Sequence, residues 1–304
     1  MPNRLCAIVG VGKIAHDQHV PAIDASPDWE LAATVSRAGS VEGVPTFRDF
    51  DVMLLERPDI EMVSLCMPPM ARYQYARKAL KAGRHVMLEK PPGQTLAEVH
   101  ALERMAEEAG VTLFATWHSR MAKGVAGARA FLAGKEVTGG RITWREDVRK
   151  WHPGQEWVWE PGGMGVFDPG INALSILTEI LPEPVHLVRA TLDVPQGRDT
   201  PIAARLTFTR GIEMDLDWRQ EGPQTWDIDI ETTEGSVSLR EGGGKLLLEG
   251  SEAAGSLSDE YPALYARMAD LVAQGQSDVD LSPLVHVSDA MTLGRRMTVE
   301  PFAF

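Results

Sequence analysis

The sequence predicts two domains of different class: an α/β domain with a doubly wound parallel sheet, and an α+β domain with a large, open, mostly antiparallel sheet. Up to about residue 120, short apolar runs alternate with helical patterns, as in a parallel sheet covered on both faces. Beyond that point, apolar residues recur at every second position, as in strands with one buried face. A chain of 304 residues can form two such domains, and we place them at 1–120 and 121–304.

These periodicities place the individual elements. In the first domain they predict strands at 5–9, 29–36, 62–66, 85–88 and 112–117, and helices at 16–23, 50–55, 73–82 and 95–109. In the second domain they predict strands at 202–208, 212–218, 226–230, 237–239 and 246–248, with the glycines at 242–244 as a turn. Helices are expected at 124–132, 168–181, 260–274 and 283–294.

The first apolar run leads directly into the motif Gly-Val-Gly-Lys-Ile-Ala at residues 10–15, and a predicted helix follows. Strand, glycine turn and helix in this order predict a dinucleotide-binding site. Gly10 would permit the tight turn, and Gly12 would let the backbone approach a pyrophosphate. Ala15 would allow the helix to pack closely on the strand. The phosphate charge would then face the positive end of the helix.

The second predicted strand ends at Ser36-Arg37, about 20 residues past the glycine motif, where the adenosine ribose of a dinucleotide is expected. Enzymes that select NAD usually have Asp or Glu at this place. A hydroxyl and a guanidinium suit a 2′-phosphate instead, with charge-assisted hydrogen bonds worth about 1.5–3 kcal/mol. The alternative is a solvated loop arginine. We predict NADP as the cofactor, with NAD also accepted.

Two later strands end at prolines. Met67-Pro68-Pro69 follows one strand and Glu89-Lys90-Pro91-Pro92 the other. Prolines end strands for simple geometric reasons, but a lysine at the carboxyl end of a strand would also point toward the cofactor. The predicted cofactor-binding residues are Gly10, Gly12, Lys13, Ile14, Ser36, Arg37, Met67, Pro68, Glu89 and Lys90.

The formal net charge of −13 argues against nucleic acid or an anionic membrane surface as a partner, because either would require a basic face. No apolar run approaches the roughly 20 residues that cross a bilayer, and the N-terminus lacks the pattern of a signal peptide. Cys6 and Cys66 lie in apolar runs, as buried thiols do in a reducing compartment. We therefore expect a cytoplasmic protein whose partner is a small molecule.

Three segments together resemble the glucose–fructose oxidoreductase and inositol dehydrogenase (Gfo/Idh/MocA) family. They are the glycine motif, Glu89-Lys90-Pro91, and the stretch from Gly162-Gly163 to Phe167-Asp168-Pro169-Gly170-Ile171-Asn172. The resemblance covers essentially the whole chain. It implies a Rossmann domain followed by an open sheet, nicotinamide-dependent oxidoreductase chemistry, and a homodimer formed through the sheet of the second domain.

The chain departs from this family in three places. Asn172 stands where most members have histidine, Met67-Pro68-Pro69 replaces the usual Thr-Pro, and Arg72 occupies a position that is often histidine. With Ser36-Arg37 and the segment 144–152, the asparagine variant resembles the bacterial aldose 1-dehydrogenases that act on L-arabinose and D-galactose. This resemblance implies oxidation of an aldose at its anomeric carbon to a lactone, with hydride transfer to NADP.

The resemblance implies Lys90, Asp168 and Asn172 as catalytic residues. Asp168 is the candidate general base for the anomeric hydroxyl, while Lys90 could orient that hydroxyl, stabilise its negative charge or take the proton itself. Asn172, one turn further on the same helix face, suits positioning. From the residues alone, Asp168 before Pro169 is typical of the N-cap of a helix that reaches about Leu181. We expect Asp168 to serve both roles.

Four further residues are candidate sugar contacts: Glu146, His152, His118 and Trp151. Glu146 and His152 could bind hydroxyls, although a charged residue in a strand more often lies on a solvated face. His118 follows the fifth strand and is a weaker candidate. Any of the tryptophans at 144, 151, 157 and 159 could stack on a sugar or pack within the sheet, and we expect one of them in the pocket.

We predict no metal site. His16 and His19 have i, i+3 spacing, which indicates helix-surface or supporting roles, and no cluster has convincing zinc-ligand spacing. Two alternatives to an aldose dehydrogenase stay open. One is another oxidoreductase of this fold, such as a different sugar or cyclitol dehydrogenase or a biliverdin-reductase-like enzyme. The other is a regulator that senses NADP without catalysis, against which the presence of both Lys90 and Asp168 argues.

Overall fold

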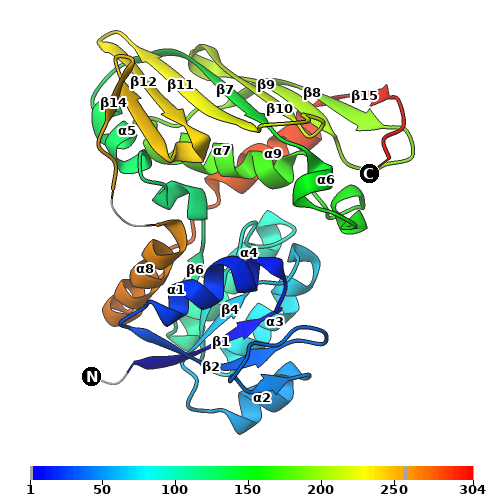
Figure 1. The fold of residues 1–304 in the computed structure, drawn as a ribbon, viewed down its shortest axis with the longest axis vertical. Coiled ribbons are helices and arrows are strands. Elements are labelled where there is room, and N and C mark those ends of the chain that lie inside the picture. The colour runs from blue at the N-terminus through cyan, green and yellow to red at the C-terminus, as the bar shows by residue number, and fades with distance from the viewer. Residues whose placement is uncertain (1–2, 257–258, 304) are drawn as a thin grey trace. The chain divides into compact units, whose positions relative to one another are not determined.

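The computed structural model describes residues 3–256 and 259–303, and the chain divides into two units (Figure 1). Unit 1 comprises Met1–His118 and Asp259–Asp280, and unit 2 comprises Ser119–Ser258 and Leu281–Phe304. The sequence predicted two consecutive stretches, 1–120 and 121–304. The structure adds Asp259–Asp280 to unit 1 because the helix in this segment packs on α1 (Val20–Asp24) there.

Unit 1 contains a six-stranded parallel sheet with the order β3-β2-β1-β4-β5-β6, which confirms the predicted doubly wound sheet. Its strands are β1 (Arg4–Val9), β2 (Trp29–Val35), β3 (Thr46–Phe47), β4 (Met62–Leu65), β5 (His85–Leu88) and β6 (Leu113–Ala115). The two-residue strand β3 was not predicted. β2 and β4 flank β1, so the strand order reverses between β1 and β4. Open α/β sheets bind ligands at the carboxyl ends of the strands where this reversal occurs.

The helices of unit 1 begin at recognisable signals. After a π-helical turn at Ala15–His19 they are α1, α2 (Phe50–Glu56), α3 (Pro69–Lys81), α4 (Leu96–Ala109) and α8 (Glu260–Gln274). The side chain of Asp49 caps α2 by accepting the N–H groups of Asp51 and Val52, and Thr95 caps α4. Helix α3 begins at Pro69 rather than at residue 73, because proline suits the first turn of a helix.

Unit 2 is built on a nine-stranded sheet with the order β14-β13-β12-β11-β7-β10-β9-β8-β15. Its strands are β7 (Val137–Arg145), β8 (Leu187–Pro195), β9 (Ala203–Phe208), β10 (Ile212–Asp217), β11 (Thr225–Thr232), β12 (Gly235–Arg240), β13 (Lys245–Leu248), β14 (Ser251–Ala253) and β15 (Arg295–Val299). Only β7 with β10 and β8 with β15 pair in parallel. The prediction of a large, mostly antiparallel sheet is confirmed.

Helices α5 (Val125–Leu132), α7 (Phe167–Ile180) and α9 (Ser282–Leu293) cover one face of this sheet (Figure 1). Strand residues that alternate toward the helices, such as Ile142 and Met214, are buried, while their neighbours Arg141 and Glu213 are exposed. The short helix α6 (Val148–Trp151) follows β7. Within 3–256 and 259–303, no helix combines the length and apolar character needed to span a membrane.

Gly165 fixes the start of α7. Its φ is +55°, and a Cβ at this position would lie 2.2 Å from the carbonyl oxygen of Pro201. In the same turn the Val166 N–H donates to the Pro201 carbonyl (2.7 Å), and the Asp168 N–H donates to the Gly165 carbonyl (2.9 Å). The turn therefore determines where α7 begins and where Asp168 lies.

We predict that Gly165→Ala lowers the free energy of unfolding more than Gly197→Ala does. Gly197 also has a left-handed backbone (φ +80°), but a Cβ there would meet nothing within 4 Å. The control therefore carries only the left-handed backbone cost of about 1–2 kcal/mol, while Gly165→Ala adds the overlap with Pro201. Denaturant unfolding of the two variants measures the difference, and equal losses would contradict a role for this contact.

Candidate active site

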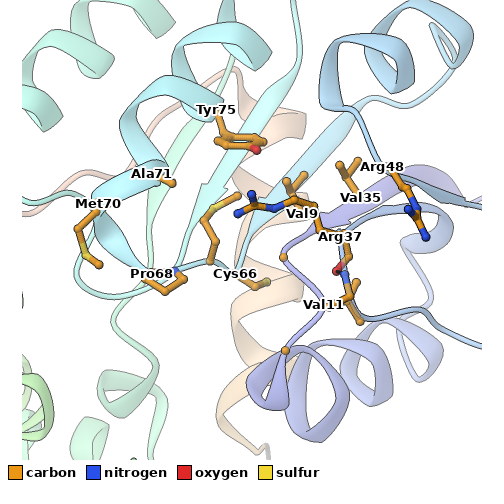
Figure 2. A pocket seen from close by; sticks show the side chains of 15 residues that line it. Val9, Val11, Val35, Arg37, Arg48, Cys66, Pro68, Met70, Ala71 and Tyr75 are labelled. Atoms are coloured by element: carbon orange, nitrogen blue, oxygen red, sulfur yellow. Dashed lines mark hydrogen bonds between the residues drawn. The ribbon is translucent and has the colours of Figure 1, made fainter. Parts of the chain in front are cut away.

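A cavity of about 460 Å³ lies at the carboxyl ends of β1, β2 and β4 in unit 1 (Figure 2). This is the place that the reversal of strand order predicts. Its lining residues are Val9, Gly10, Val11, Gly12, Val35, Ser36, Arg37, Ala38, Arg48, Cys66, Met67, Pro68, Met70, Ala71 and Tyr75. The cavity thus brings together the glycine motif, the end of the second strand and the Met67-Pro68 turn.

The glycines of this cavity fit a dinucleotide. Gly10 has a φ of +92°, and a Cβ there would lie 2.8 Å from the backbone nitrogen of Met67, so the tight turn beside β4 requires glycine. A Cβ at Gly12 would meet nothing within 4 Å, which leaves open space beside the backbone at the start of the helical turn. A pyrophosphate needs this room and the nearby helix N-terminus.

One side of the cavity carries positive charge. The Ser36 hydroxyl accepts the N–H of Gly39 (3.0 Å) and so turns the loop after β2, while the Arg37 side chain extends into the cavity (Figure 2). Arg48 lines the cavity as well. It was not predicted, because β3 is too short to show a period in the sequence. The Ser36 N–H donates to the Phe47 carbonyl (2.9 Å), which brings Arg48 beside this loop.

Four predicted cofactor residues do not line this cavity. Lys13 forms an exposed ion pair with Asp17, and the neighbouring Ile14 is exposed. Glu89 and Lys90 lie at the end of β5, where the Lys90 N–H donates to Oε2 of the buried Glu89 side chain at 2.7 Å. For all four residues, contact with a cofactor stays a prediction.

In unit 2, Asp168 lies in the first turn of α7 with a buried carboxylate. The prediction that Asp168 is the N-cap is wrong. Val166 occupies that position and already has helical backbone angles (φ −56°, ψ −17°), so the helix begins at Phe167. The Asp168 Oδ2 atom instead lies 3.1 Å from Nε2 of His152, and Nδ1 of that histidine lies 3.3 Å from Oε1 of Gln155. The buried Asp168 carboxylate and the half-buried His152 imidazole therefore form a pair.

Glu146 lies beside this pair in a group of tryptophans. Its carboxylate accepts the indole N–H of Trp218 at 3.1 Å and that of Trp226 at 3.0 Å, and the residue is 4% exposed. The alternative interpretation of Glu146, a charged residue on a solvated face, is thus wrong. The His152 ring lies 5.2 Å from the Trp218 ring, so Trp218 contacts both Glu146 and the histidine of the pair. Neither Trp218 nor Trp226 was predicted as a site residue, since in the sequence each only continued the alternation of a strand.

The remaining candidate site residues are Asn172, Trp151 and His118. Asn172 is half-buried one turn after Asp168 on α7. Trp151 is half-buried, with its ring 5.6 Å from that of Trp226. His118 belongs to unit 1, where its Nδ1 lies 2.6 Å from a carboxylate oxygen of Glu260.

The paired histidines of the first helical region differ in environment. His16 is exposed, whereas His19 is buried, with Nδ1 2.9 Å from the Tyr265 hydroxyl and Nε2 3.2 Å from a Glu89 oxygen. In the part of the chain that the structure describes, no group of three or more His, Cys, Asp or Glu is arranged to hold a metal.

Comparison with known proteins identifies the family. Residues 4–116 match the model of an oxidoreductase family with an NAD-binding Rossmann fold. The chain is 39% identical over 305 residues to galactose 1-dehydrogenase of Pseudomonas fluorescens, covering 99% of both proteins. The chain belongs to the Gfo/Idh/MocA family. It is an NAD(P)-dependent oxidoreductase, and the predicted family resemblance is confirmed.

Solved structures agree with this assignment. The crystal structure of D-galactose-1-dehydrogenase from Rhizobium etli superposes with a TM-score of 0.95 and 51% identity, over 100% of this chain and 99% of that one. A 3-ketoreductase from Actinomadura kijaniata, solved with TDP-benzene and NADP, has a TM-score of 0.81 at 18% identity, over 98% of this chain and 100% of that one. That likeness concerns the fold alone. The residues that line the cavity of unit 1 all fall within 4–116, the stretch that matches this family's NAD-binding fold.

We predict that Gly12→Val weakens NADP binding on the order of tenfold or more, equivalent to about 1.4 kcal/mol, because the side chain fills the open space beside the turn. The free energy of unfolding should change little, since Gly12 is exposed and a Cβ there would meet nothing within 4 Å. Gly12→Ala should fall between the wild type and the valine variant. Fluorescence titration with NADPH measures the affinity, and an unchanged dissociation constant would remove Gly12 from the cofactor site.

Proposed function

We propose that this oxidoreductase is an NADP-preferring aldose 1-dehydrogenase that oxidises the anomeric carbon of sugars such as L-arabinose and D-galactose. The observation that carries the proposal is the contact between the buried Asp168 carboxylate and His152, beside Glu146 and its tryptophans. Two full-length relatives are named galactose 1-dehydrogenase, one at 39% and one at 51% identity. The two sugars share their configuration at carbons 2, 3 and 4, so one pocket suits both.

In the proposed reaction, Asp168 removes the proton of the anomeric hydroxyl. The O–H bonding pair becomes the second bond of the lactone carbonyl, and the C–H pair leaves the same carbon as hydride. NADP, when bound, would supply the acceptor for that hydride. His152 orients the Asp168 carboxylate through the contact of 3.1 Å, and Asn172 positions the sugar. Lys90 is the second candidate to take the proton or to stabilise the negative charge on the oxygen.

The proposed sugar contacts are Glu146, His152, His118 and Trp151. Glu146 is the best defined, because two indole N–H groups hold its carboxylate in one orientation and a preorganised acceptor loses little entropy when it binds a hydroxyl. The half-buried indole ring of Trp226 offers a flat apolar surface that suits the C–H face of a pyranose. A buried carboxylate beside a half-buried indole suits a sugar, which is polar at its edge and apolar on its face.

A homodimer and a cytoplasmic location complete the proposal. The face of the nine-stranded sheet opposite the helices has a cavity of about 470 Å³ whose lining includes Arg141, Arg205, Glu213 and Asp215. Arginines beside carboxylates suit a two-fold interface, in which each charge of one copy can meet its opposite on the other. Both cysteines are free thiols, as is usual in a reducing compartment.

The substrate is tested with a panel of aldoses and both cofactors. We expect NADP reduction with L-arabinose and D-galactose and slower reduction with sugars that differ at carbons 2, 3 or 4. Absorbance of the reduced nicotinamide measures the rates. No activity with any aldose, from protein that binds NADPH, would refute the proposal.

The base is tested with Asp168→Ala. We expect turnover to fall by about 10²–10⁴-fold, the usual contribution of a general base. The matched control is Asp49→Ala, which removes a true helix cap and should cost about 1 kcal/mol of stability with unchanged turnover. If Asp168→Ala behaved like the control, Asp168 would be only structural.

The cofactor preference is tested with Arg37→Ala. Loss of a charge-assisted contact of about 1.5–3 kcal/mol should weaken NADP binding by about 10–150-fold and leave NAD binding within about twofold. Arg48→Ala, at the same cavity, shows whether the second arginine contributes. Equal changes for NADP and NAD would show that Arg37 does not contact the 2′-phosphate.

A further inference from the structure

The main chain around Lys90 is held from both sides by buried charged side chains. The Lys90 N–H donates to Oε2 of Glu89, and the Arg72 guanidinium donates to the carbonyls of Glu89 and Pro91, one residue on either side of the lysine. We infer that Arg72 and Glu89 are positioning residues that fix the Lys90 backbone for catalysis. The inference rests on the proposed catalytic part of Lys90.

Arg72 links the lysine segment to the cofactor cavity. It lies on α3 and is 2% exposed, and its second guanidinium nitrogen donates to the carbonyl of Met67, which lines the cavity. One planar guanidinium thus holds three carbonyls that belong to the ends of two neighbouring strands. An imidazole has only two ring nitrogens and an ammonium lacks the planar fork of donors, so arginine suits this position better than histidine or lysine.

Glu89 is itself fixed by residues that lie far from it in the sequence. Its Oε1 accepts the Tyr261 hydroxyl at 2.7 Å and lies 3.2 Å from Nε2 of His19. Nδ1 of His19 lies 2.9 Å from the Tyr265 hydroxyl. Both tyrosines lie on α8, the helix that returns to unit 1. Each oxygen of the carboxylate therefore has a partner, which prevents the side chain from rotating away from the Lys90 N–H.

The charges of this network support one another. Burial opposes ionisation of Glu89, but the hydrogen bond and charge of His19, the charge of His118 and the Tyr261 hydroxyl together hold its pKa well below the usual range. Burial likewise opposes charge on His19, but Cys66, Tyr265 and Glu89 raise its pKa well above the usual value. Glu89 is thus an ionised acceptor near neutral pH, which strengthens its bond to the Lys90 N–H.

The kinetic experiment uses Arg72→Met and Glu89→Ala, each also combined with Lys90→Ala. We expect kcat with the preferred aldose to fall by about 10–100-fold, as for a small displacement of a catalytic group. In the Lys90→Ala background neither change should lower kcat further, because effects that act through one residue are not additive. Glu89→Gln, which keeps one acceptor, should recover part of the loss.

The matched control is Arg57→Met. Arg57 also donates to a backbone carbonyl in unit 1, that of Ala32 (2.7 Å), but contacts no part of the Lys90 segment. It should leave kcat unchanged. If Arg72→Met does not fold, Arg72→Lys replaces it, since lysine keeps the charge and loses the fork of donors. Full additivity with Lys90→Ala, or an equal loss of kcat in the control, would overturn the inference.

A second measurement needs no catalysis. Amide hydrogen exchange of the full chain should show faster exchange at Lys90 in Glu89→Ala, by about tenfold or more, and unchanged exchange in Arg57→Met. Unchanged protection of the Lys90 amide in Glu89→Ala would overturn the inference. Failure of the wild type to oxidise any aldose would instead refute the proposed function, and the exchange result would still decide whether Glu89 holds Lys90.

Discussion

The cavity of unit 1 depends on one constraint of parallel sheets. Where the strand order reverses, the segments that leave the two central strands run to opposite sides, and a crevice opens at their carboxyl ends. In this chain the reversal falls between β1 and β4, so the glycine turn and the Met67-Pro68 turn border the same cavity. The contact that a Cβ at Gly10 would make with Met67 shows how closely the two turns approach.

Both units hold their site residues with buried polar groups rather than with helix caps or surface pairs. In unit 2 a carboxylate faces an imidazole, and a second carboxylate accepts two indole N–H groups. In unit 1 Arg72 and Glu89 hold the backbone on both sides of Lys90. Buried polar groups that lose a partner pay the full cost of desolvation. Such networks therefore favour a single arrangement, which suits groups that must be placed accurately.

Local patterns predicted those features that depend on neighbouring residues. The glycine motif, the strands buried on both faces and the alternating strands of unit 2 all appeared where periodicity placed them. The errors had local causes as well. Asp168 before Pro169 has the composition of an N-cap. The turn at Gly165 instead makes Val166 the N-cap, and α7 begins at Phe167, one residue before Asp168. Arg48 was missed because a strand of two residues has no period.

The sequence by itself determined the fold class, the family and the position of the glycine motif between strand and helix, because each depends on short segments with their own spacing. Only the tertiary structure decided which side chains meet. Asp168 and His152 lie 16 residues apart and Glu146 and Trp226 80 apart, and α8 brings Tyr261 to Glu89 across 172 positions. No local pattern encodes such pairs, because they form only when sheets and helices pack. The same packing brings three backbone carbonyls within hydrogen-bond distance of Arg72. From the sequence, Arg72 was notable only as a departure from the family pattern.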